Sequence, residues 1–326
     1  MRFLHRRFSQ EGSELTRGKV RVAAIQAAPV FMDRDRTVEK TVGLIGNAAS
    51  KGARLVAFGE TFIPGYPAWL DLCPGSAAWD SPPAKKAYAR LVENSVEIPG
   101  PATERLAGAA REHGVVVVVG VHERVGTGPG HGTLYNTQII FGHDGSILST
   151  HRKLVPTHAE RLIWGRGDGR GLEAVETPIG RVGNLICWEH WMPLARQAMH
   201  ESAEAIHIAA WPTVREMYLI ASRHYAFEGR CFVLAVGQII AARDLPAELE
   251  RPAELKGRDD ALVVSGGSCI IGPDGALLAG PVEGKEEILI ADLDLARIDE
   301  ESMALDVTGH YNRPDLFQLR VRRSET

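Results

Sequence analysis

The sequence contains little cysteine, no excess of basic residues and no long apolar run, and each absence excludes a class of protein. Four cysteines are spread widely over 326 residues, a pattern that indicates neither a disulfide framework nor a CxxC zinc site. The formal net charge of -4 gives no sign of nucleic-acid or membrane-surface binding. No stretch approaches the roughly 20 apolar residues that span a bilayer. We therefore expect a cytoplasmic protein that acts on a small molecule, without nucleic-acid or membrane partners.

Hydrophobic residues make up 44% of the chain, which is enough for a sizeable core, but the two ends differ from the rest. The first residues, Met1 to Arg7, are basic, and a polar segment follows them, which is not the pattern of a signal peptide. We expect residues 1–18 to form a flexible arm and residues 316–326 a solvated tail. No linker-like segment interrupts residues 19–315, so we expect them to form a single domain.

Short apolar runs rich in β-branched residues recur along the chain and predict strands. They lie at residues 20–30, 53–58, 115–121, 137–141, 205–210, 232–236, 268–271 and 288–291. Segments with helical spacing lie between several of them, at residues 37–51, 103–114, 193–203 and 214–229. This alternation predicts an α/β fold.

Two segments share one hairpin pattern. Each places Asp-Gly between apolar runs, at Asp144-Gly145 within residues 139–148 and at Asp274-Gly275 within residues 270–278. Asp-Gly is a strong turn signal, because glycine readily adopts the positive φ that a tight hairpin requires. Each hairpin follows a very apolar predicted strand at a similar distance along the chain. The repetition predicts two similar α/β halves within one domain.

Cys187 is the strongest candidate for a chemical role. It follows the apolar run Val182 to Ile186 and precedes a segment with helical spacing, so we expect it at a junction between a strand and a helix. Free amides and partial positive charge at a helix start lower the pKa of a thiol toward neutrality, and the thiolate is the reactive form. The competing interpretation is a small buried hydrophobe, which is the usual role of a free cysteine.

A nucleophile needs a base and a group that stabilises developing charge, and three further residues could supply them. Glu60 follows an apolar run, Lys153 follows the first hairpin, and Glu160 lies one loop later. Taken one at a time, Glu60 is more often a solvated carboxylate, Lys153 a surface charge and Glu160 an acid at a helix start. His151 and His158 lack a third ligand at a useful spacing, so we expect no metal site.

Together, Glu60, Lys153 and Cys187 resemble the Glu-Lys-Cys triad of the nitrilase superfamily, the carbon-nitrogen hydrolases. The resemblance rests on Gly59-Glu60-Thr61-Phe62, His151-Arg152-Lys153-Leu154 and Cys187-Trp188-Glu189, and it extends from Val20 to about Asp315. It implies an α/β fold in the form of a four-layer αββα sandwich with two pseudo-symmetric halves. It also implies that Cys187 is the nucleophile, Glu60 the general base and Lys153 the proton donor and stabiliser of intermediates. Glu160 matches a supporting glutamate of the family, and no metal or organic cofactor is implied.

Other segments resemble the nitrilase branch of the superfamily, namely Cys187-Trp188-Glu189-His190, residues 164–169 and residues 309–315. This branch implies hydrolysis of an organic nitrile to a carboxylic acid and ammonia through thioimidate and thioester intermediates. It also implies a homo-oligomer, either a dimer or a spiral assembly. The alternatives are an amidase or N-carbamoyl hydrolase with the same triad, and a non-catalytic binding protein with the same fold.

Aromatic residues near the motifs could wall an apolar substrate pocket. We expect Tyr66, Trp164, Trp188 and Trp191 to contribute, although aromatic residues beside core strands are as often packing residues. Tyr66 and Trp164 are the stronger candidates because predicted loops carry them. For His190 we expect a role in capping the following helix. The sequence does not indicate which nitrile would bind.

Overall fold

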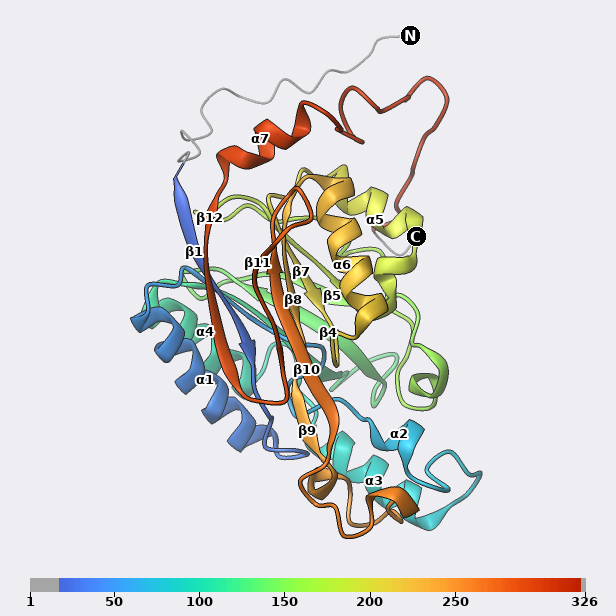
Figure 1. Ribbon diagram of the computed structural model, residues 1–326. Helices are drawn as coiled ribbons and strands as arrows, with labels where there is room; N and C mark the ends of the chain where they lie inside the picture. Colours follow the sequence, from blue (N-terminus) through green and yellow to red (C-terminus); the bar gives the residue numbers. More distant parts are fainter. Residues whose placement is uncertain (1–17, 324–326) are drawn as a thin grey trace.

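Two six-stranded β-sheets packed face to face form the centre of the computed structural model, which describes residues 18–323 (Figure 1). The first sheet has the order β12-β1-β2-β3-β4-β5. Its strands are β1 (Lys19–Gln26), β2 (Leu55–Phe58), β3 (Val116–Arg124), β4 (Leu134–Phe141), β5 (Ile147–Arg152) and β12 (Glu287–Asp294). The second sheet has the order β11-β10-β8-β7-β6, and β9 pairs with β10. Its strands are β6 (Val182–Ile186), β7 (Ile206–Ala210), β8 (Phe232–Val236), β9 (Ile239–Ala241), β10 (Leu262–Ile271) and β11 (Leu277–Glu283).

Helices cover the outer face of each sheet and complete four layers (Figure 1). α1 (Arg34–Ser50) and α4 (Pro101–His113) pack on the first sheet, and α5 (Pro193–His200) and α6 (Glu216–Gly229) pack on the second. The connections carry α2 (Trp69–Leu72), α3 (Pro82–Glu93), α7 (Ala296–Ser302) and the 3-10 helices η1 (His158–Leu162), η2 (Cys187–Trp191), η3 (Ala242–Asp244) and η4 (Ala253–Leu255). The predicted αββα sandwich is confirmed.

The pleat of the strands explains the layers. In β1, Val22 and Ala24 belong to the apolar cluster between the sheets, together with Ile208 of β7. The intervening residues, Ala23 and Ile25, belong to the cluster under α1 and α4. Because successive side chains of a strand point to opposite faces, a strand of an inner layer is buried on both faces. This is why the predicted strands read as continuous apolar runs.

The two sheets repeat one topology. β1, β2 and β3 are parallel and are followed by the antiparallel hairpin of β4 and β5. In the same way, β6, β7 and β8 are parallel and are followed by β10 and β11. Both hairpin turns contain a glycine at positive φ, Gly145 at 82° and Gly275 at 76°. The two predicted hairpins and the two similar halves are therefore confirmed.

The connections differ most from the sequence-based expectation. α3 was not predicted because it buries only Ala87 and Leu91, too few apolar residues for a clear helical pattern. Residues 241–260 are polar and charge-rich in sequence, a composition typical of an exposed surface loop. They instead contribute Leu245 and Leu249 to a small apolar cluster with Trp69 of α2, which packs this connection against the rest of the protein.

The structure describes only part of the two predicted end segments. Residues 1–17 of the expected arm lie outside the described residues. In the expected tail, Leu319 and Val321 pack against the apolar cluster under α5 and α6, and Arg323 donates to the backbone oxygen of Leu172 at 3.0 Å. The division into arm, domain and tail stays a prediction. Among residues 18–323, none of the helices combines the length and the hydropathy that a membrane span requires.

Replacing Ile208 by alanine tests the packing between the sheets. Ile208 is fully buried in this layer, and its truncation leaves a cavity that two hydrogen-bonded sheets cannot close. We expect Ile208→Ala to lower the free energy of unfolding by about 2–5 kcal/mol in equilibrium urea denaturation. Met303→Ala, at a side chain that is 89% exposed, is the control and should change it by less than about 0.5 kcal/mol. Equal losses in both variants would contradict this packing.

Candidate active site

Three strand ends meet at the junction between the two sheets. Glu60 lies two residues beyond β2, Lys153 follows β5 directly, and Cys187 follows β6 directly. β2 and β5 belong to the first sheet and β6 to the second, so both halves contribute. All three side chains are buried, and the charges of Glu60 and Lys153 both shift the pKa of the Cys187 thiol. The structure therefore brings these predicted residues together, away from solvent.

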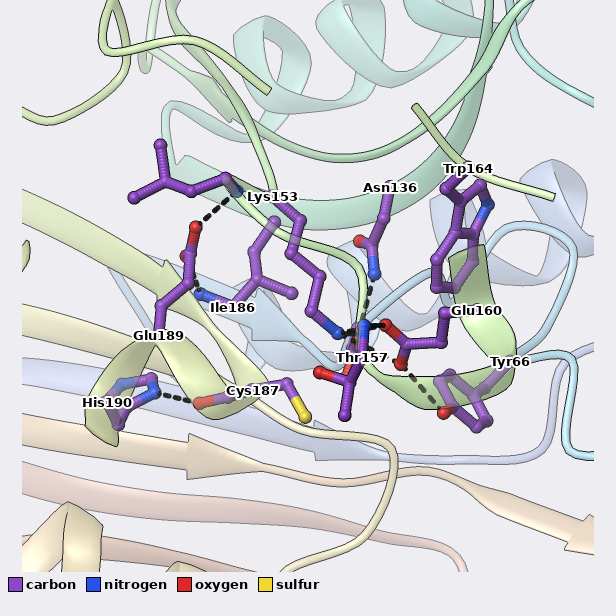
Figure 2. A network of polar contacts seen from close by, with 12 residues as sticks. Tyr66, Asn136, Lys153, Thr157, Glu160, Trp164, Ile186, Cys187, Glu189 and His190 are labelled. Atoms are coloured by element: carbon purple, nitrogen blue, oxygen red, sulfur yellow. Dashed lines mark hydrogen bonds and ion pairs between the residues drawn. The ribbon is translucent and has the colours of Figure 1, made fainter. Parts of the chain in front are cut away.

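The ammonium group of Lys153 lies between the carboxylates of Glu60 and Glu160, and Figure 2 shows its contact with Glu160. Its Nζ atom is 2.8 Å from Oε1 of Glu60, and it is 3.0 Å from Oε1 and 2.7 Å from Oε2 of Glu160. A buried charge is tolerated only when it is paired and hydrogen-bonded. The two carboxylates thus account for a lysine that is 1% exposed.

The two carboxylate oxygens of Glu60 differ in their hydrogen bonding. Asn136 of β4 donates from Nδ2 to Oε1 of Glu60 at 2.6 Å. Gln238, which follows β8, donates to the backbone oxygen of Glu60 at 2.6 Å. Within residues 18–323, the second carboxylate oxygen, Oε2, is buried and has no hydrogen-bond partner. This oxygen is free to accept a proton from another buried group.

Glu160 is also oriented by neighbours. The hydroxyl of Tyr66 donates to Oε1 of Glu160 at 2.9 Å, and the backbone amide of Thr157 donates to Oε2 at 2.6 Å (Figure 2). Sequence reasoning missed Thr157, Asn136 and Gln238. The two amides could have been found, since a polar residue within or just after an apolar run, if buried, needs a hydrogen-bond partner.

Burial and charge set the ionisation of the cluster. Burial raises the pKa of Glu60 to about 7, against the opposing effect of the Lys153 ammonium and with the support of the Glu160 charge. Burial alone would lower the pKa of Lys153, but its acidic neighbours, Cys187 and the two glutamates, raise it above its usual range. Lys153 therefore stays protonated, while Glu60 gains or loses its proton near neutral pH.

The thiol of Cys187 differs from the sequence-based expectation. Burial and the charge of Glu60 raise its pKa well above the usual range, and Lys153 and the amide of Trp188 only partly oppose this. The expected lowering toward neutrality is wrong, because a fully enclosed thiol beside carboxylates is costly to ionise and the short η2 turn compensates little. Cys187 is therefore a thiol that needs a base. It also has a positive φ of 52°, which costs a non-glycine residue about 1–2 kcal/mol.

A further glutamate, Glu189, links the end of β5 to the end of β6 by hydrogen bonds. It accepts hydrogen bonds from the backbone amides of Ile186 (Figure 2) and Leu154, both at 2.7 Å. It also lies 2.8 Å from Nε2 of His151. Burial favours its neutral form, but His151 and the two amides lower the pKa of Glu189. The sequence motif contained Glu189 without revealing this role, because the bonds join segments far apart in the chain.

The four aromatic residues predicted for a pocket do not lie together. Tyr66 touches the charged cluster through its hydroxyl, and the ring of Trp164 lies 5.8 Å from Nζ of Lys153. Trp188 and Trp191 are 49% and 39% exposed and line surface grooves, one of them beside the start of α6. The structure thus brings two of the four to the charged cluster and leaves two at the surface.

The histidines have roles other than those expected or considered. His190 does not cap α5; it is buried, and its Nδ1 lies 2.7 Å from the backbone oxygen of Cys187. His158 is exposed, with Nδ1 at 3.1 Å from Oδ1 of Asp71. In the part of the chain that the structure describes, no group of three or more His, Cys, Asp or Glu residues could hold a metal ion.

Comparisons with known sequences agree with this geometry. A model of the carbon-nitrogen hydrolase family matches residues 21–301. The chain is 42% identical over 303 residues to an aliphatic nitrilase of Sinorhizobium fredii, which covers 93% of this chain and 96% of that protein. It is 40% identical over 317 residues to a bifunctional nitrilase/nitrile hydratase of Lupinus angustifolius, which covers 96% of this chain and 89% of that protein.

A solved structure shares the fold. A carbon-nitrogen hydrolase from Helicobacter pylori is similar with a TM-score of 0.69 and 22% sequence identity, over 91% of this chain and 96% of that one. The fold, the family match over most of the chain and the extended sequence identity lead to one conclusion. This chain belongs to the carbon-nitrogen hydrolase family and is a hydrolase of carbon-nitrogen bonds.

Proposed function

We propose that this hydrolase is a nitrilase, which converts an organic nitrile into the carboxylic acid and ammonia. The observation that carries the proposal is a buried thiol, Cys187, in one cluster with the ammonium of Lys153 and with the oxygen of Glu60 that has no hydrogen-bond partner among residues 18–323. The names of the relatives at 42% and 40% identity support the nitrile as substrate. A nitrile carbon is a weak electrophile, so it needs a soft nucleophile together with protonation of nitrogen.

The first half of the reaction forms a thioimidate. Glu60 takes the thiol proton on its free oxygen as the sulfur of Cys187 attacks the nitrile carbon. An S–C bond forms, one π bond of the C≡N group breaks, and its electron pair moves to nitrogen. Lys153 donates a proton to that nitrogen and recovers one from Glu60. The product is a thioimidate, R–C(=NH)–S–Cys187, whose N–H proton came from Lys153, and the original thiol proton has restored the ammonium of Lys153.

The second half uses two water molecules. Glu60 activates the first, which adds to the thioimidate carbon, and Lys153 stabilises the tetrahedral intermediate. The C–N bond breaks with proton transfer to nitrogen, so that ammonia leaves and a thioester remains. A second water hydrolyses the thioester to the carboxylic acid and regenerates the thiol. Glu160 holds Lys153 between the carboxylates throughout, and neither a metal nor an organic cofactor takes part.

Release of the amide is a second outcome of the same intermediate. If the tetrahedral intermediate expels the thiol of Cys187 instead of ammonia, the product is the amide. The relative described as a bifunctional nitrilase/nitrile hydratase favours this possibility. Comparing ammonia and amide formed from one nitrile measures the partition, and comparing the nitrile with its matching amide as substrate separates a nitrilase from an amidase or N-carbamoyl hydrolase.

We propose that Tyr66 and Trp164 line the substrate pocket at the charged cluster, and that Trp188 and Trp191 lie at the outer side of this pocket.

We also propose that the protein works in the cytoplasm as a homo-oligomer, a dimer or a spiral. All four cysteines are free, as suits a reducing compartment. Apolar side chains on α5 and α6 are exposed, namely Leu194, Met217, Ile220 and Phe227, and a second copy of the chain would cover them.

Removing the thiol tests the nucleophile. We expect Cys187→Ala and Cys187→Ser to abolish ammonia release from any nitrile that the wild-type protein hydrolyses, because no other group can form the thioimidate. Circular dichroism should show that both variants remain folded. Cys269→Ala is the matched control, since Cys269 is also buried but lies within β10, and it should retain turnover. Ammonia release by either Cys187 variant would sink the assignment.

The pH dependence tests the base. The raised pKa of Glu60, about 7, predicts that kcat/KM falls tenfold per pH unit below about pH 7, because the base must be ionised to accept the thiol proton. Lys153 contributes no alkaline loss, since its pKa lies above the usual range. Initial rates from about pH 5 to about pH 9 measure the profile. A flat kcat/KM down to about pH 5 would show that Glu60 is not the titrating base.

A further inference from the structure

A chain of buried polar side chains runs behind Cys187, and the mechanism above does not use it. Nδ1 of His190 lies 2.7 Å from the backbone oxygen of Cys187. Nε2 of His190 lies 3.0 Å from Nε2 of His207, and Nδ1 of His207 lies 2.8 Å from Oε2 of Glu204. His190, His207 and Glu204 are 1%, 0% and 5% exposed, so these contacts form away from solvent.

The two ends of this chain determine where protons lie. A carbonyl oxygen only accepts hydrogen bonds, so Nδ1 of His190 carries a proton. Burial would favour the neutral acid of Glu204, but the adjacent His207 and His200 lower its pKa. An ionised Glu204 only accepts, so Nδ1 of His207 carries a proton as well.

The contact between His190 and His207 then lacks a hydrogen-bond donor. In a neutral imidazole with a proton on Nδ1, Nε2 is a bare acceptor. Two neutral rings would therefore place two lone pairs against each other across the 3.0 Å between His190 and His207. This contact is stable only if one of the two Nε2 atoms carries a proton.

We propose that His190 and His207 share one additional proton between their Nε2 atoms, and that this protonated pair positions Cys187 for the reaction. The proton turns the contact into a charge-assisted hydrogen bond, and the carboxylate of Glu204 balances its charge. Both histidines are positioning residues, because His190 touches the backbone of Cys187 and not the reacting atoms. The effect on turnover rests on the proposed nitrilase function, whereas the protonation state does not.

The surrounding groups fit one added charge. Tyr225 of α6 donates its hydroxyl to Oε1 of Glu204, and His200 of α5 lies 3.5 Å from the same oxygen. Arg196 of α5 donates to the backbone oxygen of His190 at 3.1 Å, and the charge of Arg196 is paired with Glu228 at 2.7 Å. Of these carboxylates, Glu204 is therefore the one in direct contact with the histidine pair.

The added proton belongs on His207. Burial and the neighbouring His207 hold the pKa of His190 well below its usual value. His207 contacts the carboxylate of Glu204, whereas His190 contacts a neutral carbonyl. Nε2 of His207 therefore donates to Nε2 of His190.

The pair acts on a strained part of the backbone. Cys187 adopts φ of 52°, a conformation that persists only when its surroundings hold it. His190 holds the carbonyl of this residue. Without the added proton the two Nε2 atoms repel each other, His190 moves, and the backbone of Cys187 loses a restraint. Misplacing a reacting group by about 1 Å lowers turnover by about 100-fold.

Neutron diffraction from crystals of the full chain in D2O tests the protonation state directly. We expect deuterium on Nδ1 of both His190 and His207 and one further deuterium between their Nε2 atoms. Deuterium on only two of these four ring nitrogens would overturn the proposal. This result is obtained on the resting protein, so it stands even if no nitrile is hydrolysed and the proposed nitrilase function fails.

Two matched Glu→Gln variants test the effect on Cys187. Glu204→Gln removes the charge beside the pair, whereas Glu228→Gln makes the same change at a carboxylate that contacts Arg196 and His200 but neither member of the pair. We expect Glu204→Gln to lower kcat at least about tenfold with little change in KM, and to lose activity at lower pH on the alkaline side than wild type. Glu228→Gln should keep the wild-type alkaline profile.

A structural defect would give a different pattern. An equal loss of kcat in both variants, or an unshifted alkaline profile in Glu204→Gln, would overturn the positioning role. If Glu204→Gln fails to fold, Glu204→Asp replaces it, because it retains the charge at a greater distance. Under the proposal, Glu204→Asp loses activity on the alkaline side at a lower pH than wild type, and the shift is smaller than complete removal of the charge would cause. An unchanged alkaline profile in Glu204→Asp counts against the proposal.

Discussion

The arrangement of the site depends on one buried ammonium group and the carboxylates that neutralise it. Lys153 is enclosed at the junction of the two sheets, and its Nζ atom bonds both Glu60 and Glu160. An unpaired charge at this depth would cost several kcal/mol, so the three residues fix one another's positions. The same pairing leaves one oxygen of Glu60 without a partner among the described residues, and burial, opposed by the Lys153 ammonium, raises the pKa of that carboxyl to about 7. Stability and reactivity therefore have a common origin here.

The two halves of the fold contribute different parts. The first sheet supplies the charged cluster, and the second supplies the thiol at the end of β6. Glu189 joins them by bonding backbone amides at both strand ends. Behind Cys187, His190 and His207 lead toward Glu204 in the connection between α5 and β7. The nucleophile is thus held by polar contacts on either side of its sheet, and this accounts for a positive φ at a non-glycine residue.

Much of this arrangement could be predicted from the sequence. The apolar runs and the Asp-Gly turns indicated the halves, and the motifs around Glu60, Lys153 and Cys187 indicated the site. The partners Asn136 and Gln238 were missed because their contacts cross between strands distant in the chain. The thiol pKa was predicted in the wrong direction, because a strand-to-helix junction reveals neither the depth of burial nor the nearby carboxylates. Such properties arise only from the packed structure.

The central claim is that nitrile carbon becomes bonded to Cys187 during turnover. Rapid acid quenching of the wild-type protein with excess nitrile, followed by mass spectrometry of the intact chain and its peptides, tests this most directly. The account predicts a mass increase that corresponds to the imidoyl or acyl group, confined to the peptide containing Cys187 and formed before the first product accumulates. Acid formation without such an adduct, or with an adduct at another residue, would contradict the account.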